Sequence, residues 1–321
     1  MLNYSIRRIL KAIPQLIIIS AIIYAIIAMV PGDFVTQMKG TNKMSAEKIE
    51  HLQELYGLDK PLPVRYATWL KSAAVGDFGD SLSHNMPVSQ VIKTYVWNSF
   101  ILSIVSTVLA YLIGIPLGIK AAIKQYSKFD KIMNVFTFVS LAVPSYLLAL
   151  VLIRIFSLGL GILPTGGMIT GGSNYTGMKN VIDIAKHSIL PITSLTILSI
   201  GPMLKFVRNC MLEVIDQDYV RTARAKGLKE KVVMYKHAFR NALIPIITNI
   251  GMSIPGLFSG ALITETIFAW PGIGKIAYDS IAARDFTLLM GFNMFMAVLT
   301  ILGNLLADLL YAVADPRIKV K

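Results

Sequence analysis

The sequence predicts an all-α integral membrane protein with six transmembrane helices and both termini in the cytoplasm. Three observations lead to this prediction. Hydrophobic residues make up 55% of the 321 residues and charged residues only 15%, whereas soluble domains contain roughly 25% charged residues. Long runs without any charged residue recur along the chain, and basic residues gather in alternate segments between these runs. Mean hydropathy, at +0.62, agrees with a membrane protein.

The charge-free runs place the spans. A helix needs roughly 20 apolar residues to cross a bilayer core about 30 Å thick, because it must satisfy its own backbone groups there. Of seven such runs, the one between Arg154 and Lys179 holds seven glycines and Pro164, so we expect a loop there. The first run lacks the cleavage pattern of a signal peptide, and we expect it to be retained. The predicted spans are about 10–31, 97–119, 132–157, 187–207, 242–264 and 287–312.

The distribution of charge predicts the orientation. With the N-terminus in the cytoplasm, the inner segments carry 19 basic and 6 acidic residues, and the longer outer segments carry 11 of each. The net charge of +13 therefore lies on one side of the membrane, as the positive-inside rule requires. This distribution accounts for the charge without nucleic acid as a partner. Cys210 is the only cysteine, which excludes an internal disulfide.

Two segments outside the spans are long. The outer one, residues 32–96, predicts a small helical cap, in which Ser45 can begin a helix that Gly57 ends. The inner one, residues 208–241, predicts a short helix that starts at Asp216 or Asp218 and stops at Gly227. Its small and basic residues are suited to docking in a groove of a partner. A basic loop lying on lipid headgroups is the alternative reading.

The sequence resembles the permease subunits of ABC importers in the oligopeptide, dipeptide and nickel group, and among them the first permease of the pair. The resemblance covers nearly the whole chain and rests on motifs in a fixed order. These are Arg7-Arg8, Pro31-Gly32-Asp33, Tyr56-Gly57-Leu58-Asp59-Lys60-Pro61-Leu62, Gly76-Asp77-Phe78-Gly79, Phe268-Ala269-Trp270-Pro271-Gly272-Ile273-Gly274, Arg284-Asp285 and Asp315-Pro316-Arg317.

The resemblance implies a type I ABC importer permease fold over residues 1–321 as one transmembrane permease domain, in the inner or plasma membrane of a prokaryotic cell. It implies that the inner loop is a cytoplasmic coupling loop, although Arg221-Thr222-Ala223 replaces the Glu-Ala-Ala triplet of the general motif. The implied ATPase-coupling residues are Asp218, Tyr219, Arg221, Thr222, Ala223, Arg224, Ala225, Lys226 and Gly227. The implied partners are a homologous second permease, two ABC ATPase subunits and an extracellular or periplasmic peptide-binding protein.

The chain carries no recognisable catalytic motif. A phosphate-binding loop of the form G-x-x-x-x-G-K-[ST] does not occur; the nearest match, at Gly274-Lys275, has Ala269 and Ile276 at two required positions. The four histidines have no zinc-ligand spacing. We therefore expect a non-catalytic transport subunit without a cofactor or metal, with ATP and magnesium bound by the partner ATPases.

Other transport classes remain as alternatives. An ion-coupled secondary transporter usually carries several ionisable groups at mid-membrane, but only Arg154 and Asp308 fall inside the spans, each near an end. A membrane scaffold is a further rival. A nickel or metal-chelate importer of the same group is the closest alternative, because a separate binding protein would choose the cargo.

Polar residues in and beside the spans are candidates for contacts with cargo and partners. Uncharged side chains that are candidates for lining the translocation path are Asn98, Ser103, Ser140, Ser145, Ser194, Asn249 and Ser253, and the alternative for each is a hydrogen bond to a neighbouring helix. Candidates for docking the binding protein on the outer side are Glu47, Glu50, Asp77, Trp270, Pro271, Gly272 and Asp279. Six prolines in the spans predict kinks.

Overall fold

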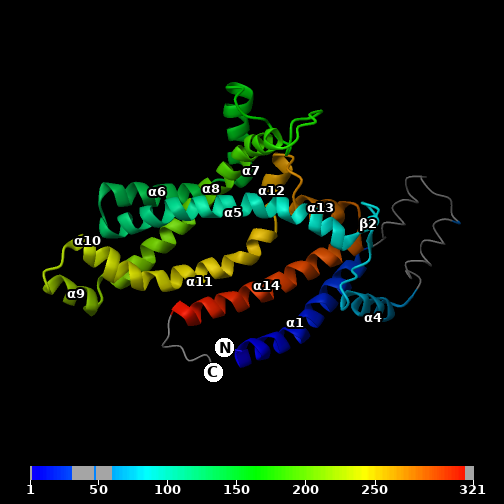
Figure 1. Ribbon diagram of the computed structural model, residues 1–321, viewed down its shortest axis with the longest axis horizontal. Coiled ribbons are helices and arrows are strands. Elements are labelled where there is room, and N and C mark those ends of the chain that lie inside the picture. The colour runs from blue at the N-terminus through cyan, green and yellow to red at the C-terminus, as the bar shows by residue number, and fades with distance from the viewer. Residues whose placement is uncertain (1, 31–46, 48–59, 315–321) are drawn as a thin grey trace.

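The computed structural model describes residues 2–30, 47 and 60–314. The described chain is almost entirely helical, and its long helices run side by side along the longest axis of the molecule (Figure 1). Within the described residues, five helices are long and apolar enough to cross a membrane, and a bent pair makes a sixth span if its two helices are taken together. The prediction of an all-α membrane protein with six spans is confirmed in this form.

The first span is α1, Leu2–Met29, and α4, Leu62–Ala73, packs beside it. Aromatic rings join the two helices, with the Tyr24 and Tyr66 ring centroids 5.4 Å apart. The Tyr66 hydroxyl also donates a hydrogen bond of 3.0 Å to the carbonyl oxygen of Ile17. This part of the predicted outer cap is therefore anchored to the first span. The helix predicted to begin at Ser45 lies outside the described residues.

The second span is longer than the sequence predicts. A short antiparallel pair of strands, β1 (Asp80–Ser81) and β2 (Met86–Pro87), leads directly into α5, Val88–Ile123. The prediction began this span at residue 97, because Lys93 interrupts the charge-free run. The first turns of α5 nonetheless bury one face, with Val88 and Val91 packed against Ile273 of a later outer segment.

The third span is sharply bent. The sequence predicts one span over 132–157, but the structure divides this region into α6 (Lys128–Ala142), α7 (Ser145–Leu152) and the π-helix η1 (Ile153–Gly159), with a bend of 99° between α6 and the α7–η1 pair. Pro144 lacks a backbone N–H, and Val143 before it takes extended geometry at ψ 120°. The segment that contains α7 and η1 projects sideways from the bundle (Figure 1).

The fourth span, α8 (Met178–Ile215), forms the centre of the packing. Gly114 and Gly118 let α5 approach it closely: a Cβ atom built on Gly118 would lie 2.7 Å from the carbonyl oxygen of Leu204. Residue numbers rise together along this contact, so α5 and α8 run parallel. On another side of α8, Thr137 of α6 faces Gly201.

The remaining elements form the cytoplasmic loop, the last two spans and the outer turn between them. They are α9 (Asp218–Ala225), α10 (Glu230–Val232), the π-helix η2 (Val233–Ala238), α11 (Phe239–Phe258), α12 (Leu262–Ile267), α13 (Ile273–Ala282) and α14 (Phe286–Ala314). The fifth span was predicted as 242–264, but α11 ends at Phe258 and a turn at residues 259–261 precedes α12.

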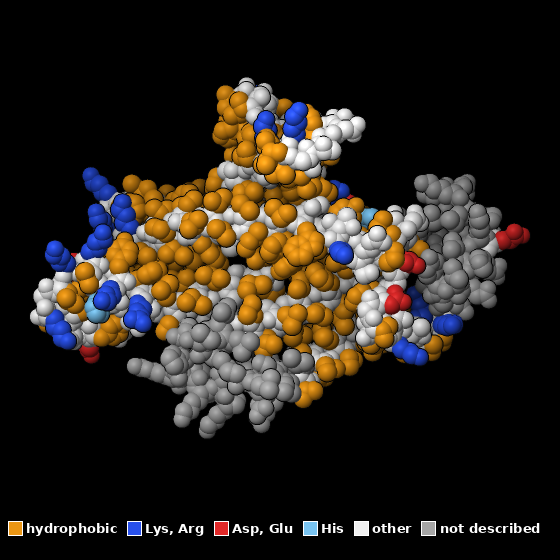
Figure 2. Space-filling view, viewed as in Figure 1, with side chains coloured by type: hydrophobic (Ala, Val, Ile, Leu, Met, Phe, Trp, Pro, Cys, Tyr) orange, Lys and Arg blue, Asp and Glu red, His pale blue; other side chains and the backbone are white. Residues whose placement is uncertain are grey.

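The surface of the molecule agrees with the predicted orientation. Figure 2 shows hydrophobic side chains over the long flank of the helices, a concentration of Lys and Arg side chains at the end that carries α9 and α10, and a mixture of acidic and basic side chains at the opposite end. The end with α9 is therefore the cytoplasmic side, and the end with β1, β2 and α13 is the outer side.

Candidate coupling surface and translocation cavity

The α9 helix presents one face to its own chain and the other to the cytoplasm. Val220 is fully buried and Ala223 is nearly so, both in a cluster with Val233, Met234 and Ala238 of the following turn. This cluster continues into α8 and α11 through apolar side chains. A displacement of α9 would therefore move the ends of both spans, because close-packed side chains transmit displacement.

The outward face of α9 carries most of the predicted coupling residues. Asp218, Tyr219, Arg221, Thr222, Arg224, Ala225, Lys226 and Gly227 are exposed, whereas Ala223 lies on the face that packs inward. Gly227 follows the helix at φ +73°, a left-handed conformation that glycine adopts without strain. Partial desolvation of the Tyr219 phenol raises its pKa. Arg224 pairs with Glu230 at 3.0 Å and connects α9 to α10.

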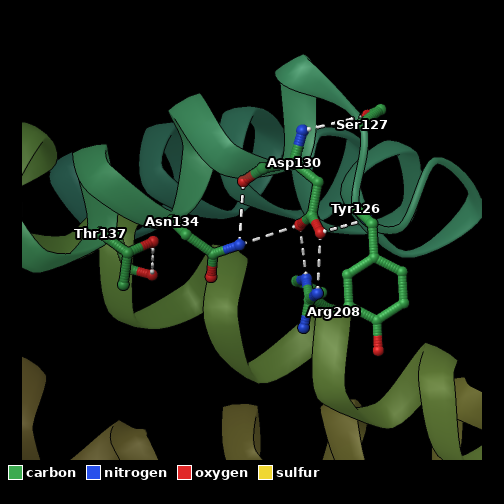
Figure 3. Close-up of polar contacts among 7 residues, drawn as sticks. Tyr126, Ser127, Asp130, Asn134, Thr137 and Arg208 are labelled. Carbon is green, nitrogen blue, oxygen red and sulfur yellow. Dashed lines mark hydrogen bonds and ion pairs between the residues drawn. The ribbon is translucent and has the colours of Figure 1, made fainter.

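A buried ion pair joins α6 to α8 at the cytoplasmic end (Figure 3). The Arg208 guanidinium donates from Nε to Oδ1 of Asp130 at 2.7 Å and from an amino group to Oδ2 at 2.9 Å. Asp130 also accepts from the Tyr126 backbone N–H and the Asn134 side chain, and only 2% of this residue is exposed. Because each carboxylate oxygen is satisfied, the pair fixes the two helix ends against each other.

A cavity of about 640 Å³ lies between α5, α8 and α11. Hydroxyl, amide and apolar groups line it, and among the described residues none of the lining side chains is charged. The Tyr111 hydroxyl of α5 lies 3.3 Å from the Ser253 hydroxyl of α11, which brings polar groups of two spans together within the lining. Such a surface can exchange hydrogen bonds with polar cargo without attracting either sign of charge.

The structure brings three of the predicted path residues to this cavity and places four elsewhere. Ser103, Asn249 and Ser253 line it. The other four do not line the cavity. Asn98 donates to Pro271 O, Ser140 donates to Thr137 O, Ser145 begins α7, and Ser194 is fully buried. Lining residues that the sequence analysis did not propose are Ser106, Thr107, Tyr111 and Ser199.

A buried carboxylate organises the outer end of the cavity. Glu265 of α12 has no exposed surface. Its Oε1 accepts from the Ser99 hydroxyl of α5 at 2.6 Å and from the Ala261 backbone N–H at 2.9 Å, while Oε2 accepts from the Lys275 backbone N–H at 2.9 Å. Ser99 in turn accepts from the Ile273 N–H at 2.8 Å. Ala261 also lines the cavity, so this cluster connects the outer wall to the second span.

Glycines make room for this carboxylate. A Cβ atom added to Gly272 would overlap the Glu265 carboxyl group, and one added to Gly274 would lie 3.0 Å from Oε2. The Lys275 N–H belongs to the first turn of α13, so Glu265 satisfies a backbone donor that the helix itself leaves unpaired. The negative charge also lies at the favourable end of the α13 dipole.

The outer residues predicted to dock a binding protein differ in accessibility. Trp270 is fully buried and donates through Nε1 to the Asn98 carbonyl oxygen, and Gly272 is buried next to it. Pro271 is half-buried. Asp279 pairs with Lys275 at 2.6 Å. Among the predicted docking residues of this turn, only Pro271 and Asp279 keep exposed surface, and the indole of Trp270 does not.

Two acidic candidates lie before α5, and a third falls outside the described chain. Glu47 is exposed, and Asp77 is also exposed and accepts from the Gly79 N–H at 2.9 Å. Glu50 lies outside the described residues. Nearby, buried Asp285 accepts from both the hydroxyl and the N–H of Ser83, which fixes the β1–β2 turn to the start of α14.

Four residues that the geometry brings to these sites were not proposed from the sequence. Glu265 served only as the end of a charge-free run, although three glycines around it were a signal of close approach. Asp130 and Arg208 gave no signal, because nothing in the sequence pairs them across 78 positions. Tyr111 has no local signal that separates it from the other aromatic residues of the spans.

Two family models together match nearly the whole chain. A model described as the inner membrane component of binding-protein-dependent transport systems matches residues 114–320. A second model, for the N-terminal part of such membrane components, matches residues 1–115.

Curated relatives match over their full length. The oligopeptide transport system permease protein AppB of Bacillus subtilis is 41% identical and aligns over 99% of this chain and 100% of its own. The dipeptide transport system permease protein DppB of Escherichia coli K12 is 34% identical, and the glutathione transport system permease protein GsiC of Pectobacterium atrosepticum is 35% identical, each over 100% of both chains.

A solved structure has the same fold. A chain of the methionine ABC transporter MetNI, in an inward-facing conformation, superposes with a TM-score of 0.52 at 17% identity, over 71% of this chain and 97% of that one. At this identity the likeness shows the fold alone. The expected type I importer permease fold is thereby confirmed.

Proposed function

The chain belongs to the family of inner membrane components of binding-protein-dependent transport systems, and from this premise we propose that it is the permease subunit of an importer that carries oligopeptides or dipeptides. The observation that carries the proposal is the uncharged cavity of about 640 Å³ between three of its spans. Peptides share backbone amides but differ in the charge of their side chains. A lining of hydroxyl and amide groups can form hydrogen bonds with the backbone amides that all peptides share. Because the lining is uncharged, it accommodates side chains of either charge.

The relatives support the same cargo class. AppB and DppB are named for oligopeptide and dipeptide transport, and GsiC is named for transport of glutathione, which is itself a short peptide. The present chain aligns with each of them over their whole length. We propose that this subunit forms half of the path and that a homologous second permease forms the other half.

We propose that α9 couples this path to two ABC ATPase subunits. Its exposed face carries Arg221, Arg224 and Lys226, while Val220 and Ala223 fasten it to the cluster that reaches α8 and α11. A force applied to the outward face would pass through these two anchors to two of the three spans around the cavity. ATP and magnesium would bind to the partner subunits.

On the outer side, we propose that a peptide-binding protein delivers cargo to the surface formed by the 270–279 turn and the segment before α5. Asp77 is exposed there and Asp279 is half-buried, and Glu47, earlier in the chain, is also exposed. Behind this surface lies the Glu265 cluster, so a contact at the 270–279 turn is directly connected to the outer wall of the cavity.

Uptake by the reconstituted complex tests the cargo assignment. Proteoliposomes would contain this chain with its second permease and ATPases, and would receive the binding protein with labelled di- and oligopeptides, or with nickel in free and chelated form. We expect uptake of peptides that depends on ATP and changes little between acidic, neutral and basic side chains.

A substitution in the cavity lining distinguishes peptide uptake through this cavity from nonspecific leakage across the vesicle membrane. Ser253→Leu adds an apolar side chain to the lining and is expected to reduce peptide uptake, while Thr300→Leu on the exposed surface of α14 should leave uptake unchanged. Nickel uptake without peptide uptake would favour the metal-chelate importer instead. Uptake driven by an ion gradient without ATP would indicate a secondary transporter and refute the proposal.

A further inference from the structure

We propose that the cytoplasmic end of α6, together with the adjoining parts of α5 and α8, forms a binding site for an anionic phospholipid. Five lysines surround this place, and we call them the basic corner: Lys120, Lys124, Lys128, Lys131 and Lys205. All five are exposed, and none forms an ion pair with another described residue. Figure 2 shows Lys and Arg side chains at this end of the molecule, directly beside a hydrophobic surface.

The acid within this stretch does not neutralise the lysines. Asp130 is the only acidic residue between Lys120 and Lys131, and both of its oxygens are engaged by Arg208. The Tyr126 N–H and the Asn134 amide take up further acceptor positions of the same carboxylate (Figure 3). No carboxylate between Lys120 and Lys131 is therefore left to pair with the lysines of the basic corner.

Two of the lysines lie against aromatic rings. The Lys120 ammonium lies 4.4 Å from the centroid of the Phe129 ring, and the Lys205 ammonium lies 5.4 Å from that of Phe138. A ring face attracts a cation and restricts where the long side chain can lie. The two ammonium groups are thus held close to α6 instead of extending freely into the cytoplasm.

An apolar strip continues from the lysines along α6. Ile132, Val135, Phe138 and Val139 are each more than half exposed. From Lys128 to Val139 the helix rises roughly 16 Å at 1.5 Å per residue, which is about half of a bilayer core of roughly 30 Å. The lysines and the strip thus match a headgroup and an acyl chain of one leaflet in both order and length.

The position of Lys205 favours a lipid phosphate as the occupant. It lies three residues before Arg208 on α8, so it is about 4.5 Å deeper in the membrane than the ion pair that marks the end of α6. A cation at that depth is costly unless it reaches the interface or meets an anion. A phosphate at the membrane surface would supply that anion, and a soluble protein surface would not reach the apolar strip below it.

Lipid retention by the purified complex tests the site. The complex would be assembled in phosphatidylcholine nanodiscs with increasing fractions of phosphatidylglycerol, and the lipids retained by this chain would be counted by native mass spectrometry. The test variant is Lys128→Gln/Lys131→Gln/Lys205→Gln. The matched control, Lys229→Gln/Lys231→Gln/Lys236→Gln, removes three exposed lysines from the cytoplasmic loop on the same side of the membrane.

Each basic residue near an anionic surface contributes about fivefold in affinity, so we expect the test variant to need on the order of 100-fold more phosphatidylglycerol for half-saturation. The control should bind as the wild type does, and replacement of the same three residues by arginine should keep binding. Equal weakening of lipid binding in both glutamine variants would indicate a nonspecific electrostatic attraction to the membrane and would overturn the site. Unchanged lipid retention in the test variant would also overturn the site. Loss of the ATPase subunits with normal lipid retention would overturn it too, because the basic corner would then contact a protein.

Discussion

Replacing Glu265 by glutamine should loosen the outer wall of the cavity without changing its shape. The carboxylate accepts three hydrogen bonds, from Ser99, Ala261 and Lys275, with no exposed surface. Glutamine has one accepting oxygen, so its amino group must face at least one of the two backbone N–H groups. A buried donor left without an acceptor costs about 1–3 kcal/mol.

Hydrogen–deuterium exchange of the assembled complex measures this loss directly. A cost of about 2 kcal/mol corresponds to roughly 30-fold more frequent opening, so peptides that cover residues 259–276 should exchange about 30-fold faster in Glu265→Gln. Peptides from α9 should be unaffected, because they lie at the other end of the spans. We also expect higher ATP hydrolysis in the absence of peptide, because a less rigid outer wall of the cavity would weaken the coupling between bound peptide and the ATPase subunits.

The control for this experiment is Glu213→Gln, which makes the same chemical change at an exposed position of α8. It should leave the exchange of residues 259–276 at the wild-type rate. If Glu265→Gln also exchanged at the wild-type rate, Glu265 would not hold the outer turn, and the reasoning from its three hydrogen bonds would be refuted.

Three further predictions concern packing and coupling. Asp130→Asn leaves Arg208 without its charged partner and should lower the free energy of unfolding by about 3 kcal/mol, which is measured as a lower Tm. The exchanged pair Asp130→Arg/Arg208→Asp should recover part of this loss. An unchanged Tm in Asp130→Asn would contradict the pairing. Gly118→Ala should cost about 1–3 kcal/mol by overpacking against α8, while Gly171→Ala, with open space around it, should not change Tm; equal Tm values would rule out the close approach. Arg221→Glu on the exposed face of α9 should reduce the co-purification of ATPase subunits at unchanged Tm, and full retention of those subunits would argue against α9 as their docking element.

The sequence predicts the spans because each depends on a local property, the length of a charge-free apolar run. It fails where a charged residue belongs to a helix that continues beyond the membrane, as Lys93 does in α5. The proline at 144 predicts a kink in the third span, but not a bend of 99°, because the angle depends on what α7 packs against. Helix ends at Asp218 and Ala225 follow from local capping signals and are close to those predicted.

In the candidate sites, too, the features that depend on local sequence can be predicted and those that depend on distant residues cannot. The sequence places the predicted coupling residues on one short helix through its basic, glycine-terminated pattern, but it does not reveal that Ala223 faces inward. The role of Glu265 depends on Ser99, which is 166 residues away, and no local pattern encodes that distance. Asn98 and Ser140 are candidates for the path because they are polar residues in or beside a span. In the structure the Asn98 side chain donates to the carbonyl oxygen of Pro271, 173 residues away, and the Ser140 hydroxyl donates to the carbonyl oxygen of Thr137 in its own helix.

Labelling of one engineered cysteine tests the central claim most directly. Cys210 is buried, so Arg221→Cys would provide the single accessible thiol of the described chain for a membrane-impermeant maleimide. The account predicts labelling in inside-out vesicles that hold the permeases alone, no labelling in right-side-out vesicles, and protection when the ATPase subunits are present. Labelling from the outer side, or equal labelling with and without the ATPases, would contradict the account.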